Sequence, residues 1–92
     1  MEFTLNKSGI HNAYEYYKDG ERLAEITWVE RGGIMTMDHT FVSPQLRGQG
    51  VAKKLLDEAA GYARKNNLKM NATCSYVVVA FENSDEYNDI KA

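Results

Sequence analysis

The amino-acid sequence predicts an α+β domain: a mostly antiparallel sheet, one parallel crossover after a long amphipathic helix, and short helices at the C-terminal end. Three observations support this prediction. Residues 14–42 form short runs in which apolar and polar side chains alternate, and tight glycine turns separate these runs. Residues 51–66 carry apolar side chains at three- and four-residue spacing. Residues 68–74 form one further short run after that helix.

The N-terminal half predicts an antiparallel meander. Residues 14–17 are rich in aromatic side chains and lead into Asp19-Gly20, a pair typical of hairpin turns because glycine adopts positive φ at low cost. The next strand spans 22–30, and its alternation predicts three buried side chains, Ala24, Ile26 and Trp28. Residues 3–5 could add a short edge strand.

A third strand is predicted over 34–42, after a second tight turn at Arg31-Gly32-Gly33. Alternation assigns one face of this strand to Met35, Met37, His39 and Phe41. It assigns the other face to Thr36, Asp38, Thr40 and Val42. The short connections between these strands favour antiparallel pairing.

The C-terminal half begins with the predicted helix over 51–66. Its apolar stripe consists of Val51, Leu55, Leu56, Ala59, Ala60 and Ala63. Asn66-Asn67 can end the helix, because asparagine tolerates the left-handed cap conformation. The strand over 68–74 then lies parallel to the strand over 34–42, since a helix connects the two.

Two interpretations stay open for residues 76–82. Ser75 could cap a short helix there, whereas the β-branched run Val77-Val78-Val79 also suits a continued strand. Residues 83–90 form a polar tail in which one or two helical turns are expected.

Length and composition limit the classes of protein that the chain can represent. With 92 residues, 43% hydrophobic and 26% charged, we expect a single domain over residues 1–92. No apolar run approaches the ~20 residues that cross a bilayer, and residues 1–6 lack a signal pattern. The single cysteine, Cys74, suits a reducing compartment. We therefore expect a cytoplasmic protein without a membrane partner, and no metal site is predicted.

Charge is distributed unevenly along the chain. The net charge of −2 argues against a dedicated nucleic-acid binder. Residues 47–69 hold six basic and two acidic side chains and carry +4, whereas the segments before and after them each carry −3. This cationic segment could attract a compact anion such as a phosphate-bearing cofactor, or it could be the solvated basic face of a helix.

The most informative segment is a loop and the helix start that follows it: Arg47, Gly48, Gln49, Gly50, Val51 and Ala52. Its two glycines remove side chains where a ligand would approach the main chain, and the first helical turn offers unpaired N–H groups. A phosphate or pyrophosphate can bind there without a metal, and Arg47 can add a charge-assisted contact. A glycine-rich turn that only reverses the chain is the alternative at this point.

The motif Arg47-x-x-Gly50-x-Ala52 resembles the Arg/Gln-x-x-Gly-x-Gly/Ala motif of the GNAT superfamily of N-acetyltransferases. Its context is similar to theirs as well. A strand ends at Phe41-Val42, a turn with Pro44 follows, and the motif then leads into a long amphipathic helix and another strand. The resemblance implies a GNAT-like fold.

More specifically, the chain resembles a subfamily of small single-domain GNAT-like proteins. Its members carry His-Thr before the motif and a cysteine after it, here His39-Thr40 and Cys74-Ser75-Tyr76. The resemblance spans about residues 19–87. Full-length GNAT enzymes usually have two helices after the first strand and extra strands after the last helix, and neither pattern is present here. Cofactor binding is therefore better supported than transfer to any particular amine.

The resemblance implies that the protein binds acetyl-CoA. Main-chain N–H groups of the motif would hold the pyrophosphate of coenzyme A, which involves Arg47, Gly48, Gln49, Gly50, Val51 and Ala52. The pantetheine arm would run between the strands that end at Val42 and Cys74, and main-chain groups of Phe41 and Val42 would pair with its amides. The acetyl thioester would then lie close to Cys74.

Three side chains are candidates for the chemistry. Cys74 stands where a strand meets a helix, whose N-terminus favours a thiolate that could accept the acetyl group, although a small buried hydrophobe is the alternative. His39 could deprotonate an incoming ammonium, with Asp38 as its rival, and alternation allows at most one of the two to reach the thioester. Tyr76, which is nearer to Cys74 than Tyr87, could protonate the departing thiolate.

The leading functional hypothesis is an acetyl-CoA-dependent N-acetyltransferase that acts on an unidentified amine, with an acyl-cysteine step on Cys74 as one route. The alternative is an acetyl-CoA-binding module with little or no transferase activity. A third hypothesis is an interaction protein that binds no coenzyme A. We expect a small-molecule cofactor and an acceptor amine as partners, no nucleic acid, and a monomer or a weak homodimer.

Overall fold

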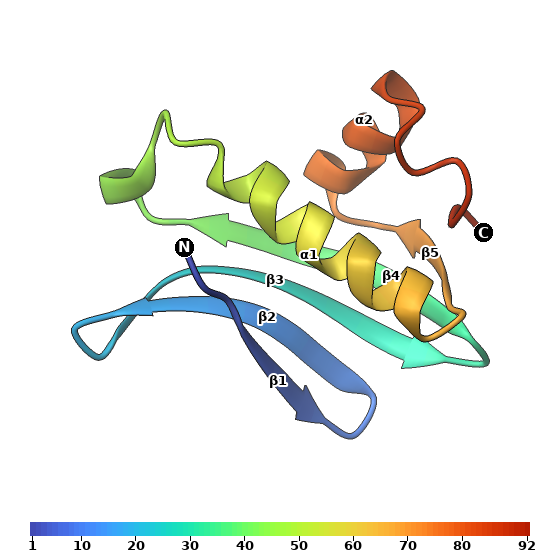
Figure 1. Cartoon of the computed structure of the whole chain (residues 1–92), viewed down its shortest axis with the longest axis horizontal. Helices are drawn as coiled ribbons and strands as arrows, with labels where there is room; N and C mark the ends of the chain where they lie inside the picture. Colours follow the sequence, from blue (N-terminus) through green and yellow to red (C-terminus); the bar gives the residue numbers. More distant parts are fainter.

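A five-stranded sheet in the order β1-β2-β3-β4-β5 forms the body of the computed structural model, which describes residues 1–92 (Figure 1). Its strands are β1 (Thr4–Ser8), β2 (His11–Lys18), β3 (Glu21–Arg31), β4 (Ile34–Val42) and β5 (Lys69–Ala72). The first four strands pair antiparallel in a meander, and β5 pairs parallel to β4. The predicted α+β class and its parallel crossover are confirmed.

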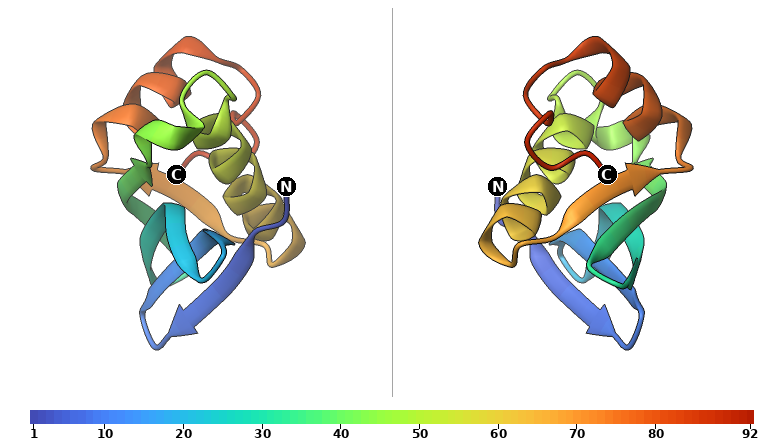
Figure 2. Two further views of the ribbon diagram at one scale, coloured as in Figure 1. Left: turned by 90° about the vertical axis from the view of Figure 1, so that its left-hand side faces the viewer. Right: turned by 90° about the vertical axis from the view of Figure 1, so that its right-hand side faces the viewer.

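Three helical segments complete the fold: η1 (Pro44–Leu46), α1 (Val51–Lys65) and α2 (Ser75–Asn83). α1 lies across one face of the sheet and α2 lies at the β5 side, and no helix covers the other face (Figure 2). Of the two interpretations for residues 76–82, the helix is confirmed. The spacing of Val77 and Phe81 explains it, because residues four apart share a helix face and both are buried here.

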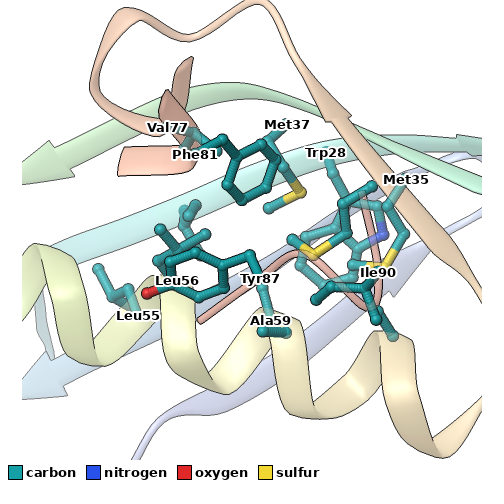
Figure 3. Close-up of a cluster of buried hydrophobic side chains, with 14 of the residues drawn as sticks. Trp28, Met35, Met37, Leu55, Leu56, Ala59, Val77, Phe81, Tyr87 and Ile90 are labelled. Atoms are coloured by element: carbon teal, nitrogen blue, oxygen red, sulfur yellow. The ribbon is translucent and has the colours of Figure 1, made fainter. Parts of the chain in front are cut away.

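The core lies between α1 and the sheet, and α2 and the C-terminal tail close it from the side (Figure 3). The predicted buried face of β3 is confirmed, because Ala24, Ile26 and Trp28 are at most 1% exposed. The apolar stripe of α1 is buried as well. Side chains from distant segments meet in this core: Met35, Met37, Leu55, Leu56, Ala59, Val77, Phe81, Tyr87 and Ile90.

Residues 84–92 form turns without a further regular helix. One helical turn, as the sequence predicts, is present where Ile90 and Lys91 donate their N–H groups to the Tyr87 carbonyl at 3.0 and 3.1 Å. The end of the tail also bonds to the free edge of β5. Met70 donates its N–H to the Ile90 carbonyl at 2.6 Å, and Ala92 donates to the Met70 carbonyl at 2.8 Å. Arg64 on α1 holds the same tail through Asp89, at 2.9 Å. The tail therefore satisfies a sheet edge that would otherwise be unpaired.

Tyr87 anchors this tail through a partly buried hydrogen bond. Its hydroxyl donates to Asp57 at 2.6 Å, and burial together with this carboxylate raises the pKa of the phenol. We expect Tyr87→Phe to lower the free energy of unfolding by about 1–2 kcal/mol, because a hydrogen bond to a charged group is lost. Tyr17→Phe, at an exposed tyrosine, should change it by less than about 0.5 kcal/mol. Urea unfolding measures both, and equal effects would contradict this role of Tyr87.

A β-bulge interrupts β4 at Asp38. Trp28 pairs with Met37 and Thr27 pairs with His39, so Asp38 has no partner on β3. Such an extra residue bends the strand and increases its twist.

The predicted face assignment of β4 is wrong beyond this bulge. One inserted residue inverts every later side chain, because the side-chain period of a strand is two. Met35 and Met37 are fully buried, as predicted. His39 and Phe41, however, lie on the face opposite the helices, and Thr40 and Val42 take their place on the helix side, where Thr40 approaches Cys74.

Candidate active site

The loop between β4 and α1 leaves a helix end without protein partners. Gly48 and Gly50 adopt φ of +80° and +67°, in the region that favours glycine, and Gly50 is the N-cap of α1. No side chain caps this end, and the first turn holds no acidic residue. The first backbone hydrogen bond of the helix runs from the Lys54 N–H to the Gly50 carbonyl. The N–H groups of residues 48–53 therefore have no backbone acceptor.

Space and charge at this helix end suit a compact anion. A Cβ added at Gly48 or Gly50 would meet no protein atom within 4 Å. Arg47 is exposed and takes part in none of the ion pairs of the protein. Lys53, in contrast, is held by Asp57 at 2.9 Å. The structure thus brings the predicted residues 47–52 together at one uncapped helix end.

β4 has no strand partner on its β5 side beyond Met37, and we call Asp38–Val42 the open edge of β4. The pairing with β5 ends where Met37 meets Ala72. The Met37 carbonyl then accepts the N–H groups of Thr73 and Cys74, at 2.9 and 3.1 Å. After these two bonds the chain leaves the edge of β4 and enters α2. An extended ligand could pair with the open edge as an added strand does.

Alternation in the β3–β4 ladder decides which main-chain groups face this edge. Ser43 donates its N–H to the Leu23 carbonyl at 2.7 Å, so residues 43 and 41 direct their polar groups toward β3. Thr40 and Val42 direct their main-chain N–H and carbonyl groups toward the open edge. The sequence predicts that Phe41 pairs with a cofactor through its main chain. Its main-chain groups face β3 instead, and what it offers a ligand is its side chain, since the residue is 39% exposed.

Cys74 lies at the N-cap of α2, beside the open edge. Its half-buried side chain packs against the hydrophobic core, and its sulfur lies 3.4 Å from the Thr40 hydroxyl. Sequence reasoning missed Thr40, because simple alternation placed it on the wrong face. The signal that could have revealed it is Asp38, since strands disfavour aspartate and a misfit residue can mark a bulge.

His39 does not reach Cys74. Its side chain is 56% exposed on the other face of the sheet, and its Nε2 lies 3.6 Å from a carboxylate oxygen of Glu25. Asp38 contacts Thr27 on this same face. The predicted separation of Asp38 and His39 onto opposite faces is therefore wrong, again because of the bulge.

Tyr76 stands in the first turn of α2 and is 37% exposed. Partial burial raises the pKa of its phenol, Lys53 offsets part of this rise, and Asp57 adds to it. The phenol therefore keeps its proton at neutral pH and can donate it. Tyr76 and Val79 also form the apolar wall of a hollow of about 250 Å³ between α1 and α2.

Comparison with solved structures defines the class of this fold. The chain matches the crystal structure of Tetrahymena GCN5 with a TM-score of 0.67 and 10% identity, over 82% of this chain and 49% of that one. At this identity the match shows the fold alone. The NMR solution structure of a GCN5-like protein from Staphylococcus aureus matches with a TM-score of 0.72 and 36% identity, over 97% of this chain and 87% of that one. The fold is the GNAT fold.

The chain belongs to the GCN5-related N-acetyltransferase family, whose model matches residues 13–90. Protein NATD1 of Gallus gallus and that of Homo sapiens are each 31% identical to it over 80 residues. These matches cover 83% of this chain, which spans 61% and 59% of the length of the two relatives. None of the helices is both long and apolar enough to span a membrane.

Proposed function

We propose that this protein is an acetyl-CoA-dependent N-acetyltransferase that acts on an amine in the cytoplasm. One observation carries the proposal: the open edge of β4 runs from Cys74 toward the uncapped N-terminus of α1. Membership of the GCN5-related N-acetyltransferase family supports acetyl-CoA as the donor. The cytoplasm is proposed because a free thiol, such as that of Cys74, suits a reducing compartment.

The residues at the start of α1 fit the pyrophosphate of coenzyme A. The N–H groups of residues 48–53 are donors without acceptors, and the helix dipole favours an anion there. Arg47 adds an unpaired cation. The residues proposed to bind this part of the cofactor are Arg47, Gly48, Gln49, Gly50, Val51 and Ala52.

The open edge of β4 fits the two amides of the pantetheine arm. Val42 and Thr40 direct main-chain donors and acceptors toward it, so an extended ligand can form strand-like hydrogen bonds. Phe41 is proposed to contribute through its exposed ring. This arrangement directs the reactive end of the ligand toward Cys74.

Each candidate side chain has one task in the proposed chemistry. Acetyl-CoA supplies an acetyl group that is activated as a thioester. The Cys74 sulfur bonds to the acetyl carbon as the bond from that carbon to the sulfur of coenzyme A breaks. The departing thiolate takes up a proton from Tyr76, and the phenol regains one from the Cys74 thiol. His39 takes the proton of an ammonium group that approaches from the uncovered face. The amine nitrogen then displaces the Cys74 sulfur from the acetyl carbon, and its second proton restores the Cys74 thiol.

The alternative is a module that holds acetyl-CoA and transfers the acetyl group slowly or not at all. A specific observation favours it, since no helix covers the sheet face on which His39 lies (Figure 2). The protein would contact an acceptor bound on that face on fewer sides than it would in a deep cleft.

Calorimetric titration with acetyl-CoA tests both functions. We expect a dissociation constant between about 1 μM and 1 mM, the range in which enzymes bind their substrates. An assay for free coenzyme A then separates the two, because a transferase releases the thiol faster when a primary amine is added. Binding without amine-dependent release would favour the module. No binding at all would contradict both.

A further inference from the structure

A hollow of about 290 Å³ lies on the sheet face that the helices leave uncovered. It follows a row of cross-strand partners on β1, β2 and β3, namely Asn6, Ala13 and Thr27, and ends on β4 at Asp38. We call it the transverse hollow, and the residues that line it and carry the argument are Asn6, Ser8, His11, Ala13, Thr27 and Asp38.

Small side chains and a bent strand make this hollow. Ala13 and Thr27 face each other across β2 and β3 and form its floor. The next row on one side holds the longer side chains of Glu15 and Glu25. The bulge at Asp38 adds twist to β4, which curves the sheet face at the end of the hollow.

Polar groups that lack protein partners line the transverse hollow. The Thr27 hydroxyl donates to Oδ1 of Asp38 at 2.5 Å, which leaves Oδ2 of this carboxylate free. The side chains of Ser8 and His11 make no hydrogen bond with the protein, and Asn6 makes one long bond of 3.4 Å. The hollow can therefore form hydrogen bonds with several hydroxyl groups of a ligand and bind one cationic group of the same ligand.

Negative charge flanks the transverse hollow. Glu15 and Glu25 are direct cross-strand partners whose side chains are only 7% and 13% exposed. Arg22 bridges them, at 3.7 and 3.2 Å. Asp38 is a third carboxylate on this face and forms no ion pair, so the excess of negative charge favours a cationic ligand.

The transverse hollow meets the open edge of β4 at Asp38. Asp38 directly follows Met37, whose carbonyl holds the N–H groups of Thr73 and Cys74. The carboxylate and the thiol thus lie close to one point of the main chain, on opposite faces of the sheet. No strand separates the two faces there, because the pairing with β5 has ended.

We propose that the transverse hollow is the acceptor site and that it takes a small primary amine with hydroxyl groups, bound as its ammonium ion. The Asp38 carboxylate holds the ammonium group, and Asn6, Ser8 and His11 bond to the hydroxyls. The assignment rests on the proposed transferase function.

Three probes with the same carbon skeleton test this assignment. Serinol carries an amine and hydroxyls, glycerol lacks the amine, and isopropylamine lacks the hydroxyls. In an NMR titration of the nitrogen-15-labelled chain, we expect serinol to shift the amide signals of Ser8, Ala13 and Asp38, with half-saturation on the order of 10 mM for so small a ligand. Isopropylamine should bind several-fold more weakly, and glycerol should give no saturable shift. Equal binding of glycerol and serinol would overturn the proposal.

Matched variants locate the probe. Asp38→Asn keeps the acceptor for Thr27 but removes the charge, and should weaken serinol binding on the order of tenfold. Asp19→Asn removes the same charge in the β2–β3 turn, where φ of +52° suits asparagine, and should leave binding unchanged. Ala13→Val fills the floor of the hollow and should abolish binding. Unchanged affinity in Asp38→Asn would overturn the assignment.

Titration of the same sample with acetyl-CoA separates this proposal from the proposed function. The cofactor should shift the amide signals of residues 48–53, and serinol those of the transverse hollow. If acetyl-CoA binds and serinol does not, the acceptor assignment fails while the transferase function stands. If serinol binds and acetyl-CoA does not, the proposed function fails, and the hollow is not an acceptor site. If both ligands bind, serinol should also increase the rate at which coenzyme A is released, and this increase should be smaller in Asp38→Asn.

Discussion

We expect the Gly50→Glu variant to bind acetyl-CoA at least about 100-fold more weakly than the wild type, which corresponds to about 3 kcal/mol. Gly50 is the N-cap of α1, and a Cβ there points into open space. A glutamate would place its carboxylate at the helix end that we propose to hold the pyrophosphate. It would satisfy the free N–H groups itself and repel the phosphates.

Gly9→Glu is the matched control for this variant. Gly9 has φ of +65°, close to the +67° of Gly50, and a Cβ there also meets no atom within 4 Å. Both variants should therefore lose about 1–2 kcal/mol of folding stability from the left-handed conformation. Calorimetry with acetyl-CoA and urea unfolding measure the two quantities separately. If both variants bind acetyl-CoA equally well, the cofactor does not use the start of α1.

The second large effect is expected at Cys74. Wild-type protein that is incubated with acetyl-CoA should gain the mass of one acetyl group, and Cys74→Ala should gain none. Turnover should fall by at least about 1000-fold, since removal of a nucleophile costs at least this much in enzymes that depend on one. Affinity for acetyl-CoA should stay within about threefold, because the binding groups that we propose belong to the main chain and to Arg47.

Cys74→Ser serves as the control for packing. Serine is close to cysteine in size and can still bond to Thr40, so this variant should fold like the wild type yet transfer the acetyl group far more slowly. Mass spectrometry and an assay for free coenzyme A give both readouts. Full turnover in Cys74→Ala would mean that the amine takes the acetyl group directly from the cofactor.

Periodicity predicts most of the secondary structure because burial follows it closely. The expected helix over 51–66 agrees with Val51–Lys65, since one stripe of α1 faces the sheet and the rest faces solvent. The expected strand over 34–42 has the same bounds as β4. β1 was only partly predicted, over 3–5, because every residue of Thr4–Ser8 is exposed and no burial pattern marks it. The expected helical turn in the C-terminal tail is present around Tyr87, whereas the bonds from this tail to β5 were not predicted, because they join segments that are distant in the sequence.

The candidate site was predictable where a motif is local and unpredictable where it depends on pairing. Residues 47–52 lie together because they are consecutive, so their place at the start of α1 follows from the chain itself. Thr40, His39 and Asp38 depend on the ladder between β3 and β4. One unpaired residue there changes which of them approaches Cys74.

By itself, the sequence determines the α+β class, the order of the elements and the glycine loop before the long helix, because these depend on local propensity and on spacing along the chain. It also carries the motif by which the family can be identified. Only the tertiary structure decides which side chains meet: Thr40 with Cys74, His39 with Glu25, and the tail with the edge of β5. Strand register controls these contacts, and a single inserted residue reverses the direction of every side chain that follows.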